Sequence, residues 1–177
     1  MRILLSVFFT LVMAAYLPGQ SLTEVRKQFH AAVIDPEQVE SYYSFIIEVK
    51  DTLPTYLAYK AAAEAMMAQN IWNPLGKFSR VSRFDNLIQE AIEKDPKNLE
   101  IHFLRFAIQY HLPRFLMMSK HLEEDRDFIV ENLWQCQELN LDSNFERYIT
   151  YFMNETGMLR PEQVEMIKTT LKPKSAR

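Results

Sequence analysis

The amino-acid sequence predicts an all-α protein of stacked antiparallel helical hairpins, with about seven to eight helices after an N-terminal export signal. Three observations favour this fold class. Apolar residues recur at three- and four-residue spacing along most of the chain. Only three glycines occur in 177 residues, which leaves little material for turns between strands. Helix starts near Pro54, Asn98 and Ser143 recur about 45 residues apart, as expected of a repeated helical unit.

The first 19 residues are typical of a secretory signal peptide. Arg2 supplies a positive charge, residues 3–17 form an uncharged, mostly apolar run of 15 residues, and Pro18 and Gly19 follow. A membrane-spanning helix needs about 20 apolar residues, so the run is short for an uncleaved anchor, which is the alternative interpretation. We expect residues 1–19 to be removed, residues 20–177 to form a single domain, and the protein to reach the bacterial periplasm or the cell exterior.

Composition excludes several classes of protein for the exported chain. Its length of about 157 residues suffices for a packed core without covalent cross-links. Cys136 is the single cysteine, so no internal disulfide is possible. Once Arg2 is removed, 19 basic residues stand against 23 acidic ones, a net charge of −4. A nucleic-acid-binding protein usually carries a basic excess, so we expect no nucleic acid as a partner.

In the first half of the exported chain, local signals predict three helices. Ser21, with Glu24 three residues later, forms a capping box that starts a helix over 22–34. Asp35 and Pro36 start a second, over 36–50, and Pro54 a third, over 54–69. The third contains closely spaced small residues that let a neighbouring helix approach: Ala58, Ala61, Ala62, Ala63, Ala65 and Ala68.

In the second half, breaking residues separate the predicted helices. Asn73, Pro74 and Gly76 indicate a loop before a helix over 78–94, and Leu112 with Pro113 ends the next helix. The remaining helices are expected at 98–111, 121–138, 142–155 and 160–171, with Gly157 as a stop. The 98–111 helix is apolar around most of its circumference, which predicts that it is buried.

One junction between helices resembles a known repeat. Ala91 is followed five residues later by Pro96, after Phe84 and Ile88, a pattern similar to the second half of a tetratricopeptide repeat. The likeness covers about 20 residues of a 34-residue unit. The loop at 70–77 is longer than in a standard repeat, and Leu141 stands where the next unit would close with proline.

The resemblance implies a tetratricopeptide-like α-α solenoid. Such proteins are generally adaptors that hold peptides or partner domains in a concave groove. The whole chain is also similar to small exported bacterial proteins of this kind that have no assigned activity.

The residue types that support catalysis or metal binding form no recognisable pattern. None of the four histidines has another histidine four residues away. His121 precedes Glu123, Glu124 and Asp125, but acidic residues in a first turn also stabilise a helix dipole, which we favour over a metal site. Cys136 at the end of an amphipathic helix is expected to be a buried small apolar residue. We predict no enzyme, no catalytic residue, no metal and no cofactor.

A narrow polar stripe crosses the most apolar helix and forms one candidate groove. His102, Arg105 and Gln109 lie on one side of the 98–111 helix because steps of three and four residues stay on one face. A buried arginine needs a partner. We favour a structural ion pair with Glu90 or Glu124. The alternative is that Arg105 faces a groove and contacts an anionic ligand.

Charge placement indicates a second candidate, a basic edge. Residues 65–84 and 101–122 contain no aspartate or glutamate, and both windows span the connection inside a predicted hairpin. In a stack of hairpins these connections share one edge. Leu75 and Leu116 add apolar surface there. The candidate partner-binding residues are Trp72, Lys77, Arg80, Arg83, Arg114, Phe115, Met117 and Met118. The alternative is that they pack into the core beneath long loops.

Together these features favour a non-catalytic interaction module or adaptor, with another envelope or secreted protein as its partner. The alternative is a small anionic-ligand-binding protein or enzyme that uses a pocket of His102, Arg105 and Gln109. A third possibility, contact between the basic edge and a membrane surface, is disfavoured by the net negative charge.

Overall fold

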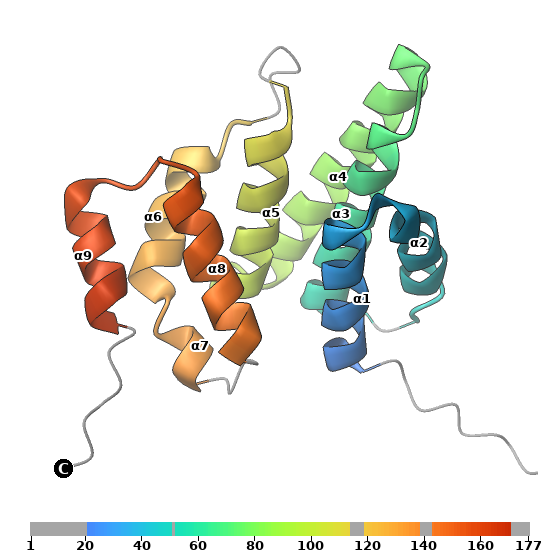
Figure 1. The fold of residues 1–177 in the computed structure, drawn as a ribbon. Coiled ribbons are helices and arrows are strands. Elements are labelled where there is room, and N and C mark those ends of the chain that lie inside the picture. The colour runs from blue at the N-terminus through green and yellow to red at the C-terminus, as the bar shows by residue number, and fades with distance from the viewer. Residues whose placement is uncertain (1–20, 51, 114–118, 139–142, 171–177) are drawn as a thin grey trace, which may run out of the picture.

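Figure 1 shows the fold in a computed structural model, which describes residues 21–50, 52–113, 119–138 and 143–170. All regular elements in these ranges are helical, which confirms the all-α class. In chain order they are α1 (Leu22–Ile34), the 3-10 helix η1 (Pro36–Gln38), α2 (Val39–Ile47), α3 (Pro54–Gln69), α4 (Pro74–Lys94), α5 (Leu99–His111), α6 (Leu122–Asn132), α7 (Gln135–Glu138), α8 (Ser143–Glu155) and α9 (Pro161–Thr170).

Some sequence predictions fall outside the described residues. They include the proposed signal peptide at 1–19, Leu141, and the part of the basic edge formed by Arg114, Phe115, Leu116, Met117 and Met118. Within the described ranges, no helix combines the length and the apolar character that crossing a membrane requires.

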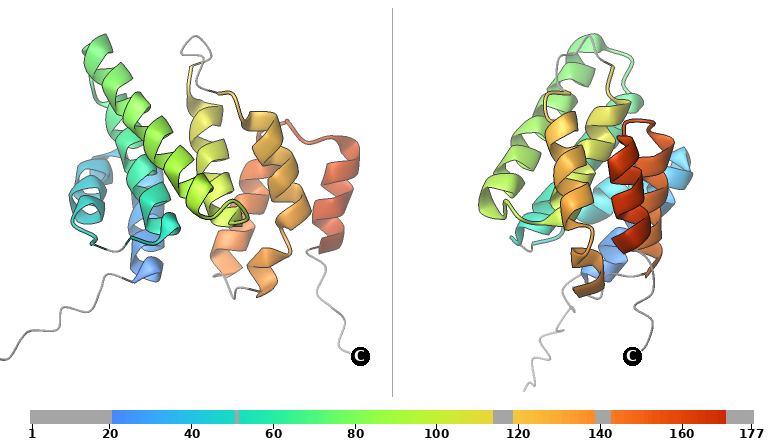
Figure 2. Two further views of the ribbon diagram at one scale, coloured as in Figure 1. Left: turned by 180° about the vertical axis from the view of Figure 1, so that it is seen from behind. Right: turned by 90° about the vertical axis from the view of Figure 1, so that its left-hand side faces the viewer.

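Two pairs of consecutive helices pack against each other in antiparallel orientation (Figure 1). α3 lies against α4 and α5 against α6, while α3 also contacts α1, α2 and α5. α1, α3, α5 and α8 run in one direction, and α4, α6 and α9 return in the other (Figures 1 and 2). The connection between α3 and α4, the end of α5 and the start of α6 therefore lie at the same end of the molecule (Figure 1).

α5 joins two apolar clusters because it buries opposite faces. Ile101 and Leu104 pack into the cluster formed by α1 to α4. Phe103 and Phe106 belong to the second cluster, with residues from α6, α8 and α9. The prediction that this helix is buried is confirmed. All six alanines named in α3 are also buried, as expected for a helix that neighbours approach on several sides.

The predicted loop before 78–94 is wrong in extent, because α4 begins at Pro74. Asn73 caps the helix by accepting a hydrogen bond from the Leu75 amide (3.1 Å), and Pro74 occupies the first helical position. Gly76 lies inside the first turn. A Cβ atom there would come within 3.1 Å of the Ile71 side chain, so glycine permits this close packing. The residues that signalled a loop are the start of the helix.

The helix predicted over 121–138 is divided into α6 and α7 by Leu133 and Trp134. Gln135, just after the break, reaches the start of α5. Its side-chain oxygen accepts from the Leu99 amide (3.3 Å), and its side-chain nitrogen donates to the Lys97 carbonyl (3.1 Å). The second predicted helix likewise ends early, at Ile47 instead of residue 50, after a 3-10 start at Pro36.

Candidate binding groove

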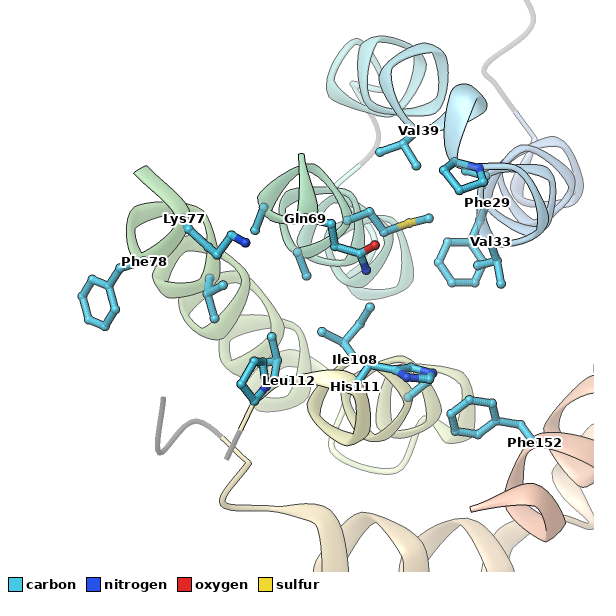
Figure 3. A pocket seen from close by; sticks show the side chains of 18 of the residues that line it. Phe29, Val33, Val39, Gln69, Lys77, Phe78, Ile108, His111, Leu112 and Phe152 are labelled. Carbon is cyan, nitrogen blue, oxygen red and sulfur yellow. The ribbon is translucent and has the colours of Figure 1, made fainter. Parts of the chain in front are cut away.

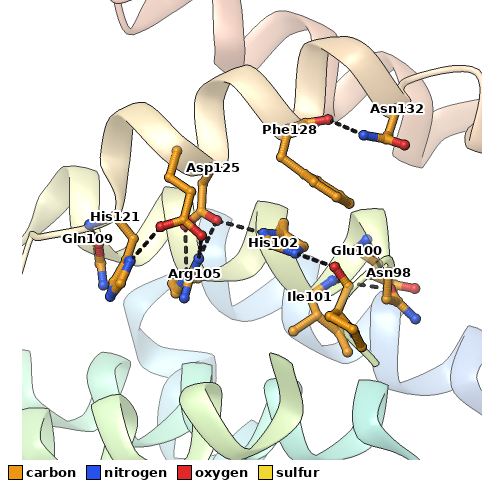
Figure 4. Close-up of polar contacts among 12 residues, drawn as sticks. Asn98, Glu100, Ile101, His102, Arg105, Gln109, His121, Asp125, Phe128 and Asn132 are labelled. Carbon is orange, nitrogen blue, oxygen red and sulfur yellow. Dashed lines mark hydrogen bonds and ion pairs between the residues drawn. The ribbon is translucent and has the colours of Figure 1, made fainter. Parts of the chain in front are cut away.

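The polar stripe of α5 is an ion-paired contact between α5 and α6 (Figure 4). Arg105 donates from Nε to Asp125 Oδ2 and from Nη2 to Asp125 Oδ1, both at 2.7 Å. His102 Nδ1 lies 2.7 Å from the same carboxylate, and its Nε2 lies 3.0 Å from the Pro96 carbonyl oxygen. The His102 ring also stacks on Phe128, with 3.8 Å between ring centroids. Arg105 is only 2% exposed, so these protein groups enclose it.

Arg105 therefore forms an internal ion pair, as the favoured interpretation of the sequence predicted, and its main partner is Asp125. Glu124, one of the two carboxylates we expected, lies 3.4 Å from Arg105 Nη2 and also contacts His121 Nδ1 at 2.8 Å. The hydrogen bond from His121 lowers the pKa of Glu124. Glu90, the other expected partner, contacts Lys94 instead.

Gln109 also bridges α5 and the start of α6. Its side-chain oxygen accepts from the His121 amide (3.2 Å), and its backbone oxygen accepts from Ser119 Oγ (2.8 Å). The side-chain nitrogen of Gln109 is buried and has no hydrogen-bond partner among the residues that the structure describes. His102, Arg105 and Gln109 thus lie between two helices of the protein, and none of them lines the groove described below. Among the described residues, no cluster of histidine, cysteine, aspartate and glutamate is arranged to hold a metal ion.

On the basic edge, Arg80 and Arg83 contact a carboxylate of the protein, whereas Lys77 contacts no carboxylate among the described residues. Arg80 Nη1 lies 2.6 Å from Glu64 Oε2, and its guanidinium stacks over the Tyr43 ring at 4.8 Å. The hydrogen bond to Glu64 raises the pKa of Arg80. Arg83 lies 3.8 Å from the same glutamate. Lys77 forms no ion pair with any residue that the structure describes. Arg80 therefore holds α4 against α3, and Lys77 is the available cation of this edge.

A groove of about 740 Å³ lies between α1, α3, α4, α5 and α8 (Figure 3). Apolar side chains from four of these helices form its walls: Phe29 and Val33 of α1, Met66 of α3, Val81 of α4, and Ala107 and Ile108 of α5. Phe152 of α8 faces them from the other side. The volume is within the usual range of about 300–1,000 Å³ for binding pockets.

The polar groups of the groove can donate hydrogen bonds. Gln69, Lys77 and His111 line it together with the apolar residues, and no aspartate or glutamate occurs among the described lining residues. Trp72, the most exposed large apolar residue at 99%, also borders the groove. Such a site suits an apolar occupant that carries acceptor or negatively charged groups at its edge.

Of the residues predicted for binding, the structure brings Trp72 and Lys77 to this groove. The sequence interpretation missed Phe29, Val33, Ile108 and Phe152, because they come from three separate helices and no local polar motif marks them. The sequence did contain one signal for the groove, at the end of α1. Val33 and Ile34 are apolar but exposed, so this helix has more apolar surface than its buried positions Val25, Phe29 and Ala32 require.

Comparison with known proteins adds no assignment: no family model matches the chain, and no curated protein or solved structure is significantly similar to it.

Proposed function

We propose that this protein is a non-catalytic interaction module of the bacterial cell envelope. Its groove would bind an apolar segment of another envelope or secreted protein. The observation that carries the proposal is the groove itself, which has apolar walls from five helices and no carboxylate among its described lining residues. An amphipathic helix that inserts its apolar face into such a groove is a common mode of peptide recognition.

Charge favours a partner segment with acidic residues beside its apolar face. Lys77 and His111 stand at the groove, and Lys77 has no ion-pair partner among the described residues. A carboxylate of the partner near Lys77 would gain a charge-assisted hydrogen bond. No described lining residue is an aspartate or glutamate, so an acidic partner segment would meet no like charge from these residues.

The arrangement of the helices supports a tetratricopeptide-like stacking of hairpins as part of this proposal. α1, α3 and α5 are the first helices of successive pairs, and α3 contacts both of the others. All three contribute to the groove. In a solenoid of helical hairpins, equivalent helices of successive repeats form an extended concave surface. The groove would then be the concave face of a short, degenerate array.

The alternative function, binding of a small anion at Arg105, has less support. Asp125 accepts hydrogen bonds from Nε and Nη2 of that guanidinium, and the side chain is buried between α5 and α6. An anion would have to displace an internal carboxylate. We therefore assign Arg105 a structural role and assign partner binding to the groove.

Two neighbouring substitutions on α1 test the proposal. Val33 lines the groove and is 41% exposed, whereas Ile34 is 68% exposed and is not a lining residue. Val33→Glu places a carboxylate in the apolar wall, and Ile34→Glu makes the same chemical change outside it. A partner is first isolated by affinity capture from the envelope fraction and purified. Its affinity for each variant is then measured by calorimetry, after circular dichroism has verified folding.

We expect Val33→Glu to weaken binding on the order of a hundredfold, because the new carboxylate is desolvated without a partner. Ile34→Glu should bind like the wild type. Equal affinity of all three proteins for the captured partner would show that the groove is not the binding site.

A further inference from the structure

Three large apolar side chains are exposed in the connection between α3 and α4 and in the first two turns of α4. Trp72 is 99% exposed, Leu75 79% and Phe78 54%. Leu75 and Phe78 are three residues apart in the first two turns of α4, so they lie on adjacent positions of one helix side. Trp72 precedes that helix by two residues. We call these three residues the tip patch. Isolated exposed apolar residues are ordinary, but a contiguous group marks an interaction site.

The charges around the tip patch are predominantly positive. Lys77 lies between Leu75 and Phe78 in the sequence, and Arg80 and Arg83 follow on α4. Glu64 is the carboxylate that contacts both arginines. Glu64 neutralises Arg80, and Arg83 lies about 12 Å along α4 from Leu75, so Lys77 is the uncompensated positive charge at the tip. The chain as a whole carries −3, but charges separated by more than about 8 Å are largely screened at physiological salt. The local excess therefore determines which surface the tip attracts.

We propose that the tip patch docks on an anionic lipid surface, with Trp72, Leu75 and Phe78 in the interfacial layer and Lys77 against the lipid headgroups. Tryptophan is enriched at the boundary between headgroups and acyl chains. Apolar side chains of peripheral proteins enter that boundary to a depth of about 5–10 Å. This inference goes beyond the proposed function and does not depend on it.

Geometry favours a membrane over a second protein as the occupant of the tip. The connection between α3 and α4 forms one end of a helical hairpin (Figure 1), and the three side chains of the patch are exposed there. A partner protein would need a complementary hollow to bury a side chain that stands free on every side, as Trp72 does. A lipid interface accepts such a side chain without complementary shape. Each lysine or arginine near an anionic leaflet increases the affinity for it about fivefold, so the positive charge of Lys77 favours binding to anionic lipid.

The tryptophans allow a direct test. The chain contains only Trp72 and Trp134, so the Trp134→Phe variant reports on Trp72 alone. Its fluorescence is recorded with vesicles of phosphatidylglycerol and phosphatidylcholine, and with phosphatidylcholine alone. A third set contains brominated acyl chains, which quench nearby tryptophan. All proteins carry the full chain, so residues 3–17 contribute equally to each. We expect a blue shift and quenching with the anionic vesicles and loss of both at high salt.

Substitutions made in the Trp134→Phe variant, each with a matched control elsewhere in the chain, test whether vesicle binding occurs through the tip patch. Leu75→Ser should weaken vesicle binding on the order of tenfold, because one apolar side chain no longer leaves water. Ile47→Ser, an equivalent change on α2, should have no effect. Lys77→Gln should weaken binding about fivefold. Lys94→Gln, at the other end of α4 and about 26 Å away, should leave it unchanged.

Several results would overturn the proposal. Trp72 emission that is unchanged by anionic vesicles excludes insertion. Equal binding to both lipid compositions excludes the anionic surface as the ligand. If the blue shift occurs in the absence of lipid and increases with protein concentration, the tip patch mediates self-association instead. Binding that survives Leu75→Ser places the lipid contact elsewhere in the chain. Trp72, Lys77 and Phe78 also line the groove, whereas Leu75 does not. The Leu75→Ser result is therefore the one that separates this proposal from the Val33→Glu experiment.

Discussion

Removal of the Asp125 carboxylate should destabilise the fold strongly. Asp125 is fully buried and accepts two hydrogen bonds of 2.7 Å from Arg105, in addition to its contact with His102. Asp125→Ala leaves the Arg105 guanidinium buried with Glu124 at 3.4 Å as its remaining carboxylate contact. Breaking one side of a buried ion pair costs about 3–5 kcal/mol. For a domain of this size, that corresponds to a decrease in Tm of roughly 6–20 °C.

The partner substitution distinguishes an ion pair from a simple loss of packing. In the double variant Arg105→Met and Asp125→Ala, the unpaired guanidinium is also removed. We expect the double variant to be no less stable than Asp125→Ala, with a coupling free energy of about 2–3 kcal/mol between the two sites. Urea unfolding followed by circular dichroism measures all four proteins of the cycle.

Glu124→Ala is the matched control, because Glu124 immediately precedes Asp125 on α6 and also contacts Arg105. Its side chain is 63% exposed, so its loss should cost no more than about 1 kcal/mol. Two results would refute the reasoning. One is a double variant whose loss in the free energy of unfolding equals the sum of the two single losses. The other is a small effect of Asp125→Ala alone. Arg105 would then be available to a ligand, and the anion-binding alternative would regain support.

Two further predictions concern titrating groups. Burial raises the pKa of the Cys136 thiol to about 12, so a thiol reagent at pH 8 should modify it only after unfolding in urea; rapid modification of the folded protein would contradict this. The hydrogen bond from Arg126 lowers the pKa of Asp127 below its ordinary value of 3.8. The ionised form thus stabilises the fold above pH 3.8, and this contribution disappears as the pH falls from there toward the folded-state pKa. Urea unfolding should therefore show a gap between wild type and Asp127→Asn at pH 6 that shrinks at pH 3; a constant gap would argue against it.

Helix boundaries were predictable wherever the signal was local. Ser21 caps α1 by accepting from the Glu24 amide at 3.3 Å, and Asn98 caps α5 by accepting from two backbone amides. α1 and α3 have the predicted bounds. A cap depends on three or four consecutive residues, so the sequence contains all the information that it requires. The start of α4 was missed because proline and glycine occur both in loops and in first turns.

Burial was predictable where the sequence contains too few polar residues to form a solvent-exposed face. α5 is apolar around most of its circumference and lies between both clusters, and Cys136 is buried as expected. A helix without an amphipathic face has no side to present to water, so its composition alone indicates an interior position.

Partners across helices were decided by the tertiary structure. The sequence indicates that Arg105 needs a carboxylate, but several lie within reach of an unplaced helix. The packing of α6 on α5 selected Asp125 and left Glu124 as a weaker contact. Similarly, Arg80 belongs to a basic window of the sequence, yet α3 supplies Glu64 to neutralise it. Ion pairs between distant residues depend on helix rotation and offset, which periodicity does not determine.

The sequence by itself determined that this chain forms helices, where most of them begin, and that α5 and Cys136 are interior. These properties follow from local capping and from the periodicity of apolar residues along one helix. Only the tertiary structure decided that α1, α3, α4, α5 and α8 enclose a groove, and that Trp72, Leu75 and Phe78 remain in water. Both depend on how faces of separate helices meet, and that geometry is fixed by packing over the whole fold.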